Sequence, residues 1–69
     1  MRISERLIFE RKQQRYSQRA LAALAGVSNT TIARIEANAV TPDTATIEKL
    51  AKALKVPALQ LMGWTDEPT

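Results

Sequence analysis

Cysteine and histidine are absent from this chain, and their absence excludes several kinds of site. Without either residue the chain cannot form disulfides, Cys/His zinc sites, cysteine nucleophiles or histidine general bases. No apolar run approaches the roughly 18 residues of a membrane span, and the first four residues are followed by charge instead of an apolar core. We therefore expect a soluble cytoplasmic protein that is not an enzyme, with no cofactor, no metal and no small-molecule ligand.

The chain has 69 residues, which is room for one small domain, and its composition favours helices. Hydrophobic residues make up 45%, alternating β-branched runs are missing, and both glycines stand at expected helix boundaries. The net charge is +3, with six of the ten cations between Arg2 and Arg19, whereas residues 65–69 are acidic. A solvated helix face explains this bias as well as a nucleic-acid partner does, so charge alone does not decide between them.

Apolar periodicity and capping residues predict five short helices in an all-α bundle. Ser17, Ser28 and Asp43 are expected N-caps, Gly26 ends the second helix by adopting positive φ, and Asn38 takes the same conformation after the third. The expected helices cover about residues 3–14, residues 18–25, about residues 29–37, a segment with its core face at Ile47, Leu50, Ala51 and Leu54, and residues 57–62.

The second and third helices are predicted to form a helix-turn-helix. Leu21 and Leu24 are expected to face the core from one helix, and Ile32 and Ile35 from the other. The third helix then leaves a second, mainly polar face exposed, at Asn29, Thr30, Ala33 and Arg34. A major groove about 12 Å wide admits a helix of about 10–12 Å, so this pattern favours a DNA-reading helix.

Three segments of the chain together resemble one family: residues 17–22 (SQRALA), 25–28 (AGVS) and 32–36 (IARIE). With Pro42, residues 50–54 (LAKAL) and residues 61–62, they are similar to the phage Cro and repressor family, also called XRE-type. The resemblance implies a five-helix, lambda-repressor-like fold over residues 1–64, with residues 65–69 as a tail or the start of a linker. It also implies binding of a double-stranded DNA operator by a homodimer, formed through the C-terminal helix or a missing C-terminal domain.

The resemblance assigns base reading to Asn29, Thr30 and Arg34. The chemistry agrees, since Arg forks onto guanine, Asn pairs with adenine and a Thr methyl meets thymine. The structural alternative is a solvated helix face. The residues expected to contact phosphates or base edges are Gln18, Arg11, Ser28, Thr31, Ala39 and Thr41. Gln18 is expected to use its backbone N–H and its side-chain amide, and the alternative for it is an ordinary exposed glutamine.

Arg11 and Glu36 match a charged pair that joins the first and third helices in this family. Two interpretations stay open: a structural ion pair only, or a pair whose guanidinium also faces the phosphates. The chain departs from the family pattern after the third helix, where Ala39 and Thr41 stand in a loop without basic residues. Their backbone N–H groups are expected to bind phosphate instead. Lys55 also occupies a position where a helix-ending glycine is usual.

The predicted function is a transcriptional regulator, a repressor that binds a palindromic operator as a dimer. One alternative is an antitoxin-type regulator that also binds a toxin protein, and another is a coactivator that uses the same fold to bind protein. Trp64 is expected to pack on the domain edge or to join an interface.

Overall fold

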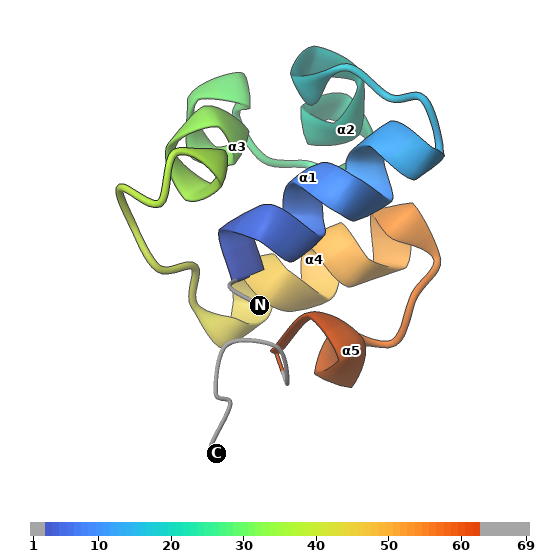
Figure 1. Cartoon of the computed structure of the whole chain (residues 1–69), viewed down its shortest axis with the longest axis vertical. Helices are drawn as coiled ribbons and strands as arrows, with labels where there is room; N and C mark the ends of the chain where they lie inside the picture. Colours follow the sequence, from blue (N-terminus) through green and yellow to red (C-terminus); the bar gives the residue numbers. More distant parts are fainter. Residues whose placement is uncertain (1–2, 63–69) are drawn as a thin grey trace.

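The computed structural model describes residues 3–62, and every regular element in this part of the chain is a helix. The expected all-α fold with five helices is confirmed (Figure 1). The helices are α1 (Ile3–Gln13), α2 (Gln18–Ala25), α3 (Asn29–Glu36), α4 (Thr44–Leu54) and α5 (Ala58–Met62). The expectations for Trp64 and for the tail at 65–69 lie outside the described residues.

Side-chain caps set where three of the helices begin. The Ser17 hydroxyl accepts the Ala20 N–H at 2.9 Å, and the Ser28 hydroxyl accepts the Thr31 N–H at 3.0 Å. Asp43 Oδ1 accepts the Thr46 N–H at 2.8 Å at the start of α4. Each bond satisfies one backbone donor that the first helical turn leaves without an internal partner. All three predicted caps are therefore confirmed.

The turn between α2 and α3 depends on a left-handed residue. Gly26 has φ 75°, and its N–H and that of Val27 both donate to the Ala22 carbonyl, at 2.9 and 3.0 Å. Asn38 likewise has φ 61°, as expected. Arg15 and Lys55 adopt the same conformation, with φ 62° and 60°. A side chain makes this region costly, so both residues hold backbone strain at the ends of helices.

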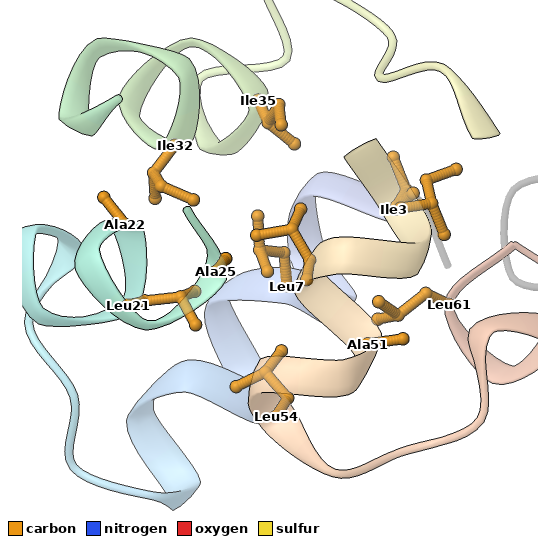
Figure 2. Packing of buried hydrophobic residues seen from close by; sticks show 12 residues of the cluster. Ile3, Leu7, Leu21, Ala22, Ala25, Ile32, Ile35, Ala51, Leu54 and Leu61 are labelled. Atoms are coloured by element: carbon orange, nitrogen blue, oxygen red, sulfur yellow. The ribbon is translucent and has the colours of Figure 1, made fainter. Parts of the chain in front are cut away.

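Aliphatic side chains from all five helices form one core between them (Figure 2). The largest completely buried members are Leu7, Leu21, Ile32, Ile35, Leu50, Leu54 and Leu61. Each such side chain contributes about 1.5–3 kcal/mol through removal from water. Helix α2 packs against both α3 and α4, while α1 packs against α3 and α5. The core therefore fixes the position of α3 from two sides, through α1 and α2.

The prediction that Leu24 belongs to the core is wrong, because its side chain is 57% exposed. Helix α2 instead turns Leu21, Ala22 and Ala25 inward. At 100° per residue, Leu24 lies to the side of the face that these three residues form. None of the helices in residues 3–62 has the length and apolar character needed to cross a membrane.

Candidate nucleic-acid interface

Helix α3 is held by two buried side chains and presents polar ones outward. Ile32 and Ile35 point into the interior that also contains Leu7 and Leu21 (Figure 2). The face of α3 that carries Ile32 and Ile35 is therefore packed against the core. Ser28 is the N-cap of α3, and it is exposed together with Asn29 and Thr30 in the first turn.

The structure places Asn29, Thr30 and Arg34 together on the exposed side of α3. Within residues 3–62, none of these three side chains has a hydrogen bond or ion pair to another part of the chain. Their donors and acceptors are therefore available to a ligand. Ala33 is only half-buried and adds apolar surface between them.

Ser28 and Thr31 serve the helix as well as its surface. The two hydroxyl groups lie 2.8 Å apart, and Ser28 also accepts the Thr31 backbone N–H. Their hydroxyls are therefore oriented by the cap, and any outward contact must be shared with it. Ser28 is exposed and Thr31 is half-buried.

A hydrogen-bonded cluster of three side chains joins α1, α2 and α3, and we call it the Glu36 network: Arg11, Gln18 and Glu36. Arg11 Nε donates to Glu36 Oε2 at 2.6 Å, and Arg11 Nη2 donates to Oε1 at 2.9 Å. Gln18 Nε2 donates to the same Oε1 at 2.9 Å. The hydrogen bonding between Arg11 and Glu36 raises the pKa of Arg11 above its ordinary value, while partial desolvation opposes the effect and the charge of Glu36 adds to it.

The Glu36 network limits what Arg11 and Gln18 can offer to a ligand. Arg11 Nη1 also donates to the Tyr16 carbonyl at 2.8 Å, so three of the five N–H groups of a guanidinium are engaged. The Arg11 side chain is 11% exposed and that of Glu36 is 6% exposed. Gln18 is half-buried, with one amide proton directed at Glu36 and one remaining.

The loop after α3 contains two backbone N–H groups that are expected to bind phosphate, those of Ala39 and Thr41, and the structure uses one of them internally. The Ala39 N–H donates to the Arg34 carbonyl at 2.9 Å and so closes the end of α3. This donor is used within the domain and is not available to a phosphate, contrary to the prediction. Thr41 is exposed, and its backbone N–H makes no backbone bond within the described chain.

Three structural contacts were not predicted from the sequence. Gln14 Nε2 donates to the Leu54 carbonyl at 2.6 Å, which ties the end of α1 to the end of α4. Glu10 is buried, and its Oε2 lies 3.3 Å from Arg6 Nη1 and 3.2 Å from Gln60 Nε2. The i,i+4 spacing of Arg6 and Glu10 could have indicated the ion pair between them.

Across residues 3–62, no cluster of side chains suited to holding a metal is found.

Comparison with known proteins identifies the family to which this arrangement belongs. A family model described as helix-turn-helix matches residues 7–61. The chain belongs to the phage Cro and repressor (XRE-type) helix-turn-helix family. Among curated proteins, no sequence matches the chain.

Two solved structures of this helix-turn-helix family are similar to the chain. The solution structure of the DNA-binding domain of the P22 c2 repressor is 31% identical, with a TM-score of 0.85, and the match covers 90% of this chain and 82% of that one. The crystal structure of the P22 c2 repressor with synthetic operator 9T is also 31% identical, with a TM-score of 0.82 and coverage of 88% and 92%. The lambda-repressor-like fold expected from the sequence is confirmed.

Proposed function

We propose that this chain is a sequence-specific DNA-binding transcriptional regulator that acts as a repressor. The observation that carries the proposal is the division of α3: Ile32 and Ile35 anchor it, while Asn29, Thr30 and Arg34 stay exposed without partners in the described chain. A helix held in this way projects beyond its domain and fits a major groove about 12 Å wide. The P22 c2 repressor, which is similar over most of its length, has been crystallised with a synthetic operator.

The three exposed side chains divide the reading of the bases between them. Arg34 donates two parallel hydrogen bonds to guanine O6 and N7, and Asn29 pairs with adenine through its amide. Thr30 places its methyl group against thymine. Ser28 and Thr31 add contacts to phosphates or base edges with hydroxyls that the N-cap has already oriented.

Phosphate anchoring comes from the N-terminus of α2 and its surroundings. Gln18 opens this helix, where backbone N–H groups and the helix dipole favour an anion. Its remaining amide proton and the two remaining Arg11 N–H groups lie at the same junction, because both side chains bind Glu36. The Thr41 N–H adds a further backbone donor.

A homodimer is supported by an exposed leucine on the last described helix. Leu59 is 74% exposed on α5, close in the chain to the half-buried Val56. Pairing of two α5 surfaces removes this apolar area from water. It also presents two α3 helices to half-sites of a palindromic operator, about 34 Å apart. Such a dimer on an operator represses by excluding the polymerase.

Selection of binding sites from random DNA, followed by the Arg34→Ala variant, tests the reading face. The variant should lose preference at one base pair per half-site and bind about 1–3 kcal/mol more weakly. Lys12→Ala serves as the control, since it removes an exposed cation from α1 and should leave the base preference unchanged. An Arg34→Ala profile identical to that of the wild type would contradict the proposed role of α3.

Sedimentation of the Leu59→Asp variant tests the dimer. A carboxylate on α5 should shift the protein to monomer and weaken operator binding without changing the selected sequence. Leu24→Asp, which also alters an exposed leucine but on α2, should still dimerise. A Leu59→Asp protein that sediments as the wild type does would place the dimer interface elsewhere.

A further inference from the structure

An open groove lies between α2 and α4, away from the proposed reading helix. It has a volume of about 560 Å³, which is within the range of about 300–1,000 Å³ seen for ligand sites. Tyr16, Leu24, Ala25 and Ala53 contribute its apolar part. Leu24 stands out among them, because its side chain is 57% exposed instead of packed.

The rim of this α2–α4 groove is positively charged. Lys49 and Lys52 line it from α4 and Lys55 from the end of that helix, and no carboxylate is among the described residues that line it. All three lysines are exposed, and none forms a close ion pair with a carboxylate in the described chain, while the charge of Lys49 also acts on Asp43. An apolar floor beside three exposed ammonium groups is complementary to a ligand that carries both apolar and negative groups.

We propose that the α2–α4 groove binds an acidic segment of a partner protein, with an apolar side chain of that segment covering Leu24. Carboxylates on either side of the apolar residue then meet the three lysines. This site goes beyond the proposed DNA-binding function, because it concerns a second macromolecule and a different face.

Lysines also bind DNA phosphates, but the apolar floor of this groove favours a protein. A phosphate backbone has no apolar group to cover Leu24, Ala25 and Ala53, so DNA there would leave the exposed leucine in contact with water. A peptide gains from both parts of the groove. Apolar anchors within a charged rim are typical of helix-in-groove and acidic-motif recognition.

The groove and the proposed reading helix can be occupied together. No residue of α3 lines the groove, and α2 separates them, since it packs against α3 and α4. A partner bound at Leu24 therefore leaves Asn29, Thr30 and Arg34 exposed. The partner would be recruited to the DNA with the regulator.

Fluorescence anisotropy of a labelled peptide tests the proposal on the full chain. The probe is a synthetic peptide of about ten residues in which Asp and Glu surround one leucine and one phenylalanine. We expect saturable binding that Leu24→Ser weakens about tenfold, because a leucine contact is lost, and that Lys52→Glu weakens about threefold or more. The controls Val40→Ser and Lys12→Glu change an exposed valine and an exposed lysine outside the groove, and should leave peptide binding unchanged.

Four results would overturn the proposal. The first is that the peptide shows no saturable binding, and the second is that a control peptide with serine in place of leucine and phenylalanine binds equally well. The third is that Lys12→Glu weakens peptide binding as much as Lys52→Glu does. The fourth is that Lys52→Glu loses DNA binding and keeps peptide binding. The last of these would assign the lysines to phosphates. Thermal melting of each variant checks the fold, and the exposure of Leu24 and Lys52 leads us to expect wild-type melting temperatures.

Discussion

Replacing Glu36 with alanine should weaken the fold and DNA binding together, because one carboxylate holds three helices. Its two oxygens accept from Arg11 Nε at 2.6 Å, Arg11 Nη2 at 2.9 Å and Gln18 Nε2 at 2.9 Å. Alanine removes all three acceptors. The Arg11 side chain, which is 11% exposed in the wild type, then keeps a single internal partner, the Tyr16 carbonyl.

The size of the effect follows from how far this pair is buried. Breaking a fully buried ion pair costs about 3–5 kcal/mol, and losing a hydrogen bond to a charged group costs about 1.5–3 kcal/mol. Arg11 retains the Tyr16 carbonyl and some access to water, so we expect about 2–3 kcal/mol for Glu36→Ala. For a domain of this size that corresponds to a melting temperature lower by about 10–20 °C. Total stability for a chain of this length is only about 3–10 kcal/mol, so the loss is a large share.

Thermal unfolding followed by circular dichroism measures this loss, and a double-mutant cycle with Arg11→Ala assigns it. The coupling energy between the two substitutions should be about 1–3 kcal/mol, as for residues in one network. Glu48→Ala is the matched control, because Glu48 is an exposed glutamate of α4 that makes no ion pair within the described residues. A Glu36→Ala melting temperature equal to that of Glu48→Ala would refute the bridging role of Glu36.

Two further predictions concern the ends of α4. Lys55 has φ 60°, so Lys55→Gly should relieve strain and raise the free energy of unfolding by about 1 kcal/mol. Lys52→Gly, inside α4, should lower the free energy of unfolding by a similar amount. Denaturant unfolding compares the two variants, and equal effects of the same sign would contradict the argument from φ. At the other end, hydrogen bonding by the Thr46 side chain and backbone lowers the pKa of Asp43. The stability gained from this carboxylate is present above the ordinary aspartate pKa of about 3.9 and is lost as the pH falls through the lower folded value. Asp43→Asn keeps a cap without a charge, so its melting temperature should fall less between neutral and acidic pH than that of the wild type; parallel pH profiles would rule out this role of Asp43.

The helix boundaries could be predicted from the sequence because the signals that set them are local. A side-chain cap joins a serine or aspartate to a backbone N–H three residues later, so its signal lies within one helical turn of sequence, as at Ser17, Ser28 and Asp43. Gly26 ends α2 for an equally local reason, its positive φ. The all-α fold follows once these short helices have to bury their apolar sides against one another.

Contacts between distant residues explain what the sequence did not predict. The i,i+3 spacing of Leu21 and Leu24 fits an apolar stripe, yet the helices packed against α2 select a narrower face with Ala22 and Ala25. Nothing near Gln18 indicates that its amide binds Glu36, 18 residues further along the chain. The Ala39 N–H differs from these cases, because it donates to the Arg34 carbonyl only five residues earlier, at the end of α3.

These long-range contacts change how variants of the proposed DNA interface should be interpreted. Arg11 and Gln18 were expected to contact phosphates, and each also holds α3 in place through Glu36. A weaker DNA affinity in Arg11→Ala therefore has two sources, a lost phosphate contact and a displaced α3. Asn29, Thr30 and Arg34 have no such internal role in the described chain, so their substitutions test the proposed base reading without loss of an internal contact. The loss of affinity in an Arg11 or Gln18 variant measures phosphate binding only after the part that accompanies its change in melting temperature has been subtracted.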